Sequence, residues 1–157
     1  MDREHRPAPP PPAYFAAAFA VGAGLLDRAL PRRPRPGPVG RTVGSTLIAL
    51  GATAITGSLR EMHRYHTTPL PFREPSALVR TGPFAYTRHP IYVGMAAVYA
   101  GAAALRGSYG PWLTLPLALG LLDRTVVQRE EDVLDARFGG TFTAYRWRTP
   151  RWVGLPH

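Results

Sequence analysis

The sequence contains no cysteine, which excludes a disulfide framework, a thiolate nucleophile and a cysteine-ligated metal. It contains no lysine either: all 19 basic residues are arginines, and they give the 157-residue chain a formal net charge of +9. These arginines lie in connections and at the ends of apolar segments, without the interleaved aromatic residues of a groove-reading face. This distribution favours contact with lipid headgroups over binding of nucleic acid. We therefore expect no nucleic-acid partner and no thiol chemistry.

Apolar residues are gathered into four blocks, at residues 13–30, 42–59, 90–105 and 109–127. A membrane-spanning helix needs about 20 apolar residues, so the first two blocks are long enough and the last two are short. The blocks carry little of the polar face that a helix in a soluble bundle presents to water. We predict an all-α integral membrane bundle of about four transmembrane helices. A soluble four-helix protein is the alternative, because shorter apolar runs are often buried core helices.

The length of the chain allows one domain, residues 13–157, after a proline-rich and poorly ordered tail at residues 1–12. The tail lacks the features of a signal peptide, so we expect the first apolar block to remain as a helix. The connection at residues 31–38 has a proline at every second or third position and cannot be helical. Small residues spaced along the second and third blocks, among them Gly57 and Gly101, allow helices to pack closely in a membrane.

The arginines also predict an orientation. With four spans, the tail, the second connection and the C-terminal segment lie on one side, and they hold 13 of the 19 arginines. The positive-inside rule makes that side cytoplasmic, although the five arginines from Arg28 to Arg41 oppose it. We expect a multi-pass protein of a bacterial-type inner membrane. Its last apolar helix should continue to about Phe138 as a cytoplasmic extension that ends at Gly139 and Gly140.

Two polar clusters stand next to apolar blocks. The first, residues 78–94, runs into the third block, and Pro90 suits the first turn of a helix that begins there. The second, residues 128–131, follows the fourth block and supplies the carboxylates that the first cluster lacks. Taken singly, the two clusters could be no more than headgroup contacts, a helix cap and a solvated, salt-bridged face. Together they predict one site at the membrane surface.

The two clusters contain an ordered pair of motifs. Residues 81–94 read Thr-Gly-Pro-Phe-x-Tyr-x-Arg-His-Pro-x-Tyr-x-Gly, and residues 129–139 read Arg-Glu-Glu-x-x-Leu-x-x-x-Phe-Gly. This pair resembles the isoprenylcysteine carboxyl methyltransferase family and the related phospholipid methyltransferases, over residues 78–152, about half of the chain. The resemblance implies an integral membrane enzyme that transfers a methyl group from S-adenosylmethionine.

The resemblance also implies roles for individual residues. Those expected in catalysis are Arg88 and Glu131. Those expected to bind the cofactor are His89, Pro90, Tyr92, Gly94, Glu130 and Glu131, and those expected to bind substrate are Tyr145 and Arg148. Phe142 departs from the pattern, because a tyrosine is common there. The cofactor presents charged groups, a ribose and an adenine, for which cations, carboxylates and aromatic faces are suitable partners.

The methyl acceptor is left open as a lipophilic or small carboxylate, amine or thiol, reached from membrane lipid. A carboxylate needs no general base, whereas an amine must lose a proton, for which Glu131 or His89 could serve. Two other functions are considered: a sterol-reductase-like protein that binds NADPH, and a non-catalytic membrane protein of the same fold. His63 and His66 could share a helix face, but we expect no metal site. Asp123 is a secondary candidate, either as a functional acid or as a partner of Arg124.

Overall fold

The computed structural model describes residues 10–30, 36–68 and 75–153. Within these ranges the chain is helical and has no strand, which confirms the predicted all-α class. The other residues include most of the predicted tail, residues 1–9, and most of the proline-rich connection, residues 31–35, so both of these predictions lie largely outside the described ranges.

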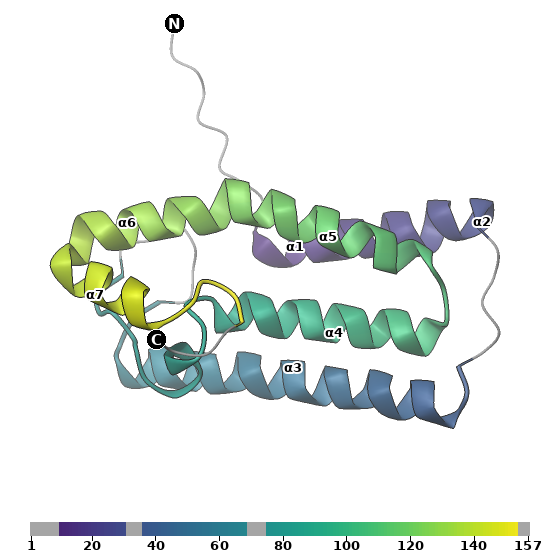
Figure 1. Cartoon of the computed structure of the whole chain (residues 1–157), viewed down its shortest axis with the longest axis horizontal. Helices are drawn as coiled ribbons and strands as arrows, with labels where there is room; N and C mark the ends of the chain where they lie inside the picture. The colour runs from purple at the N-terminus through teal and green to yellow at the C-terminus, as the bar shows by residue number, and fades with distance from the viewer. Residues whose placement is uncertain (1–9, 31–35, 69–74, 154–157) are drawn as a thin grey trace, which may run out of the picture.

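Six longer helices make up the bundle (Figure 1): α1 (Pro11–Val21), α3 (Pro38–Arg64), α4 (Pro90–Arg106), α5 (Gly110–Leu122), α6 (Gln128–Phe138) and α7 (Gly140–Arg148). Four short pieces complete the described part: the π-helical turns η1 (Gly22–Leu26) and η3 (Asp123–Val127), the turn α2 (Asp27–Ala29) and the 3-10 turn η2 (Gly82–Ala85). The helix α1 begins two residues inside the predicted tail. Prolines occupy the first turns of α1, α3, α4 and α5, where a missing N–H leaves no hydrogen bond unmade.

Helices α3 and α4 lie antiparallel and side by side (Figure 1), with their backbones in close approach. A Cβ atom on Gly51 would lie 2.5 Å from the carbonyl oxygen of Gly94, and one on Gly101 would lie 2.5 Å from that of Gly44. Small residues of this kind are typical of helix pairs in membranes. The predicted close approach at Gly101 is confirmed, whereas Gly57 faces Pro83 of η2 instead of α4.

The pieces α5, η3 and α6 form one long rod that ends at Phe138 (Figure 1). Gly139 follows at a φ of +49°, a conformation that glycine adopts without steric cost. Helix α7 then folds back, and the hydroxyl of Tyr145 donates a hydrogen bond of 2.6 Å to the carbonyl oxygen of Phe84 in η2. The rod and α7 thereby bring the second polar cluster to the end of the bundle where α4 begins.

The opposite end of the bundle is held by Asp27. Its Oδ1 accepts a hydrogen bond of 2.9 Å from the backbone N–H of Gly110, at the start of α5. Its Oδ2 pairs with Nε of Arg106 at 3.3 Å, and the Arg106 side chain is 50% exposed. A second donor of Arg106, Nη2, reaches the carbonyl oxygen of Ala23 at 3.1 Å. This cluster fastens η1, α2, the end of α4 and the start of α5 together.

Among the described residues, α3 is the one helix long and apolar enough to cross a membrane. Only 17% of its apolar window is buried inside the protein, whereas the core helix of a soluble protein is mostly buried. Large apolar side chains are also exposed along α5, with Leu117 63% accessible. Exposed apolar surface of this kind suits lipid better than water. All four spans and the cytoplasmic position of α6 stay predictions.

Candidate functional site

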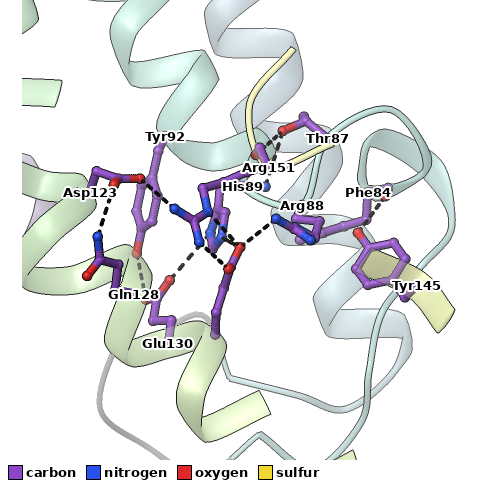
Figure 2. A network of polar contacts seen from close by, with 11 residues as sticks. Phe84, Thr87, Arg88, His89, Tyr92, Asp123, Gln128, Glu130, Tyr145 and Arg151 are labelled. Carbon is purple, nitrogen blue, oxygen red and sulfur yellow. Dashed lines mark hydrogen bonds and ion pairs between the residues drawn. The ribbon is translucent and has the colours of Figure 1, made fainter. Parts of the chain in front are cut away.

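The start of α4 and the C-terminal segment are joined by backbone contacts (Figure 2). The backbone N–H of Arg88 donates to the carbonyl oxygen of Pro150 at 3.0 Å. The hydroxyl of Thr87 donates to the carbonyl oxygen of Arg151 at 2.9 Å and accepts from the N–H of His89 at 3.3 Å. The residues just before α4 therefore lie between the helix and the C-terminal segment, and their side chains face α6.

Glu131 lies at the centre of the polar network, and its side chain is 4% exposed. Its Oε1 contacts Nη2 of Arg88 at 3.1 Å, Nε2 of His89 at 3.2 Å and Nε of Arg151 at 3.1 Å. Its Oε2 contacts Nη2 of Arg151 at 2.6 Å. Figure 2 shows Arg88 and His89, from the segment before α4, converging with Arg151 from the C-terminal segment. Because an ionised carboxylate only accepts hydrogen bonds, Nε2 of His89 carries the proton in this contact.

Glu130, the neighbouring residue, has different partners. Its Oε1 accepts a hydrogen bond of 2.6 Å from the hydroxyl of Tyr92, and its Oε2 lies 3.6 Å from Nδ1 of His89. The rings of His89 and Tyr92 are stacked, with centroids 5.6 Å apart and planes 7° apart. Trp152 covers the imidazole from the C-terminal segment at 6.2 Å. One imidazole thus lies between two carboxylates on α6.

The two carboxylates differ in their acidity. Burial raises the pKa of Glu131, but hydrogen bonds from His89 and Arg151 and the charge of Arg88 outweigh burial and lower it to about 2. Burial also raises the pKa of Glu130, and the hydrogen bond from Tyr92 does not reverse that effect. Burial lowers the pKa of Arg88, which Glu131 opposes. Glu131 is therefore held as the anion, while Glu130 is the better proton acceptor of the two.

A cavity of about 550 Å³ opens beside this network, within the usual range for a small-molecule site. Polar groups from Arg88, His89, Tyr92 and Glu130 line it together with apolar side chains from α3, α4, α6 and residues 75–79. Two buried polar atoms of lining residues have no hydrogen-bond partner, namely Nε of Arg88 and the hydroxyl of Thr67. Buried polar groups are rarely left unpaired, so these two atoms are unusual features of the walls of the cavity.

The predicted site residues fall into two groups. Arg88, His89, Pro90, Tyr92 and Glu130 line the cavity. The rest lie elsewhere: Glu131 lies behind the lining, Gly94 packs against α3, Tyr145 contacts Phe84, and Arg148 is exposed on α7. A Cβ on Gly94 would meet Cγ1 of Ile55 at 2.7 Å, so glycine is needed there for helix packing.

Three residues of the site were missed or misjudged in the sequence. Arg151 lies outside both motifs and has no role predicted from the sequence, and Asp123 is predicted either as a functional acid or as a partner of Arg124. Asp123 instead lies 3.4 Å from Nη1 of Arg151. Thr67 carries no sequence signal, because its position depends on the turn after α3, where His66 has a φ of +52°. Proximity across 20 residues or more is not visible in local spacing.

No group of His, Cys, Asp and Glu suited to a metal ion occurs among the residues that the structure describes. A family model described as phospholipid methyltransferase matches residues 39–141, a range that includes both motifs in full. No curated protein and no solved structure matches the chain. The family match covers more than half of the chain and ends before Arg151.

Proposed function

The chain belongs to the phospholipid methyltransferase family, and we propose that it uses S-adenosylmethionine to methylate a lipophilic or small acceptor at the membrane surface. One observation carries the proposal: the cavity beside the two motifs is lined by a cation, Arg88, by the imidazole of His89 and by a carboxylate, Glu130. In this proposal α1, α3, α4 and the α5–η3 part of the rod cross the membrane, α6 extends beyond it, and the cavity faces the cytoplasm.

The lining of the cavity fits the cofactor group by group. The guanidinium of Arg88 would pair with its carboxylate, and Glu130 would accept from its ammonium or ribose hydroxyls. The stacked His89 and Tyr92 offer polar and aromatic surface for the adenine or the region around the sulfonium. Pro90 lines the cavity as well and keeps the first turn of α4 in place. When bound, S-adenosylmethionine would supply an activated methyl group on an excellent leaving group.

The protein's own contribution would be to position the reactants and to exclude water. Holding reactants in the right geometry can lower a reaction barrier substantially. Arg88 would act at the ligand, as the catalytic or binding residue that the resemblance implies. Glu131 would act through Arg88 and His89, because it contacts both and does not line the cavity. For an amine acceptor, Glu130 would take the proton, because its raised pKa suits that task better than the lowered pKa of Glu131.

The two residues expected to bind substrate would act from outside the cavity. Tyr145 would hold Phe84, a lining residue, through its hydrogen bond to the Phe84 carbonyl oxygen. Arg148 is exposed on α7, where it could reach only a part of the acceptor that stays outside. A long acceptor whose reactive end enters the cavity would suit both positions, and membrane lipids are the expected source.

The proposal is tested by methyl transfer. The purified protein in detergent is incubated with S-adenosylmethionine labelled in its methyl group and with an extract of bacterial membrane lipids. We expect label in the lipid fraction, suppressed by an excess of S-adenosylhomocysteine and lowered by Glu130→Gln. Absence of transfer, together with absence of S-adenosylmethionine binding in equilibrium dialysis of the same folded sample, would contradict the proposal.

A further inference from the structure

The C-terminal segment is docked by contacts that do not need the side chain of Arg151. The carbonyl oxygen of Pro150 accepts from the backbone N–H of Arg88, and that of Arg151 accepts from Thr87. Both hydrogen bonds use backbone atoms of the C-terminal segment, so they would remain if the Arg151 side chain were shortened. The guanidinium therefore has another role.

That guanidinium grips both oxygens of the Glu131 carboxylate. Its Nε lies 3.1 Å from Oε1 and its Nη2 lies 2.6 Å from Oε2. Arg88 and His89 both contact Oε1. Within the described ranges, Arg151 is the one residue that donates a hydrogen bond to Oε2. Because the terminal torsion of a glutamate rotates over a broad range, the two-point contact with Arg151 is what fixes where Oε1 points.

The orientation of the guanidinium is itself fixed by a third contact. Nη1 of Arg151 lies 3.4 Å from Oδ1 of Asp123 in η3, two turns before Glu131 on the same rod. The side chain of Arg151 is 32% exposed, whereas that of Glu131 is 4% exposed. The arginine therefore remains partly hydrated while it neutralises a carboxylate that is not. A lysine could not make the same contacts, because an ammonium lacks the planar, two-point geometry of the guanidinium.

We propose that Arg151 is a positioning residue of the site: it sets the plane of the Glu131 carboxylate and thereby holds Arg88 and His89 toward the cavity. Arg88 and His89 line the cavity, and Arg151 does not. This inference rests on the proposed function for its effect on ligand binding, but its structural content, the coupling of Arg151 to His89 through Glu131, does not depend on any ligand.

The ligand-free test is NMR of the protein labelled with ¹⁵N-histidine in detergent, with the His89 signals assigned by their loss in His89→Gln. Arg151→Gln should shift or broaden the Nε2 signal of His89. Arg124→Gln, which removes the same charge from an exposed position of η3, should leave it unchanged. An unmoved His89 signal in folded Arg151→Gln would overturn the proposal whether or not the protein binds S-adenosylmethionine.

The functional test is the affinity for S-adenosylhomocysteine in the same variants. We expect Arg151→Gln to weaken binding about tenfold, the scale on which contacting side chains couple. Arg151→Lys, which keeps the charge and is the more certain to fold, should lose affinity to a smaller extent, and Arg124→Gln should match the wild type. Wild-type affinity in Arg151→Lys and Arg151→Gln would contradict the positioning role and leave the proposed function standing.

A double-mutant cycle separates action through Glu131 from a merely structural role. If Arg151 acts through that carboxylate, Arg151→Gln should cost little further affinity in a protein that already carries Glu131→Gln. Additive losses, with a lowered melting temperature in each single variant, would indicate that Arg151 only anchors the C-terminal segment. Absence of S-adenosylhomocysteine binding in the wild type would instead contradict the proposed function, and the NMR result would still decide the positioning claim.

Discussion

The two ends of the bundle each join an acidic residue to an arginine, yet only one end has the features of a site. At the end near α2, Asp27 pairs with the half-exposed Arg106 and accepts from the first turn of α5. At the other end, Glu131 is almost fully buried beneath Arg88, His89 and Arg151.

Their surroundings account for the difference. The Asp27 cluster is satisfied by backbone groups of two neighbouring elements, the carbonyl oxygen of Ala23 in η1 and the N–H of Gly110 in α5, and thereby serves helix packing. The Glu131 cluster adjoins a cavity and leaves Nε of Arg88 buried without a partner. Burial of charge is costly, so a cluster of buried charges whose members line a cavity is the better candidate for ligand binding. An ion pair alone does not distinguish a site from a structural contact.

The largest difference between the two ends should come from deleting the carboxylates. Glu131→Ala leaves Arg88 and Arg151 buried near each other without a counter-charge, and removing one partner of a buried ion pair costs about 3–5 kcal/mol. Asp27→Ala removes a cap at the start of α5, which typically costs about 1 kcal/mol. Thermal unfolding of both variants in detergent measures the difference between the two losses of stability. Equal losses at the two ends would contradict the distinction drawn here.

Glu130→Gln should separate binding from folding. It removes a charge from the cavity, and hydrogen bonds to charged groups contribute about 1.5–3 kcal/mol, so the affinity for S-adenosylhomocysteine should fall about 10- to 100-fold. The melting temperature should change little, because Tyr92 can still donate to the amide oxygen. Asp27→Asn is the matched control at the other end and should bind as the wild type does. Unchanged affinity in Glu130→Gln would remove Glu130 from the proposed site.

The pH dependence of stability should differ in sign between the two glutamates. The pKa of Glu131 is lowered from an ordinary 4.5 to about 2, so this group stabilises the fold at pH values above 4.5. The contribution is lost as the pH falls toward 2. The raised pKa of Glu130 has the opposite effect: its contribution is present below the ordinary value and is lost as the pH rises through the raised pKa.

Melting temperatures between pH 2 and 8 for the wild type, Glu131→Gln and Glu130→Gln measure these contributions as differences between curves. The effect should be smaller than that of Glu131→Ala, because a protonated carboxyl group keeps its place and some of its hydrogen bonds. If Glu131→Gln and the wild type lose stability in parallel below pH 4.5, the lowered pKa is contradicted.

The smallest expected effect is at Thr67. Thr67→Val keeps the shape of the side chain and removes a buried hydroxyl that has no partner, so the ligand-free protein should be as stable or more stable, by about 1 kcal/mol. If the hydroxyl binds the ligand, affinity should fall by about 3- to 10-fold, in line with one neutral hydrogen bond. Thr67→Ser should retain wild-type affinity. A loss of stability in Thr67→Val would show that the hydroxyl has a partner within the protein.

The parts of this structure that could be predicted from the sequence are those set by local patterns. The third apolar block and Pro90 placed α4 to within one residue, at Pro90–Arg106 against the predicted 90–105, whereas α3 at Pro38–Arg64 is longer at both ends than the predicted 42–59. The two motifs were expected to form one site, and the structure brings Arg88 and His89 onto Glu130 and Glu131. The family resemblance is confirmed by the match over residues 39–141.

What could not be predicted depends on the packing of distant segments. Gly94 belongs to the first motif, but its role against α3 follows from the way that Gly44, Gly51 and Gly101 lock the two helices together. Which glutamate faces the cavity follows from the rotation of α6, because neighbouring residues on a helix point about 100° apart. Asp123 and Glu131 both pair with Arg151. The distance from Arg151 to these two carboxylates depends on how the C-terminal segment returns to α4.

The most direct measurement of the central claim is a calorimetric titration of the purified wild-type protein in detergent with S-adenosylhomocysteine, with NADPH titrated in parallel. The account predicts saturable binding of S-adenosylhomocysteine at one site per chain and no binding of NADPH. Binding of NADPH alone would contradict the account in favour of a reductase-like cofactor site. Binding of neither by a protein shown to be folded would contradict it in favour of a non-catalytic member of the family.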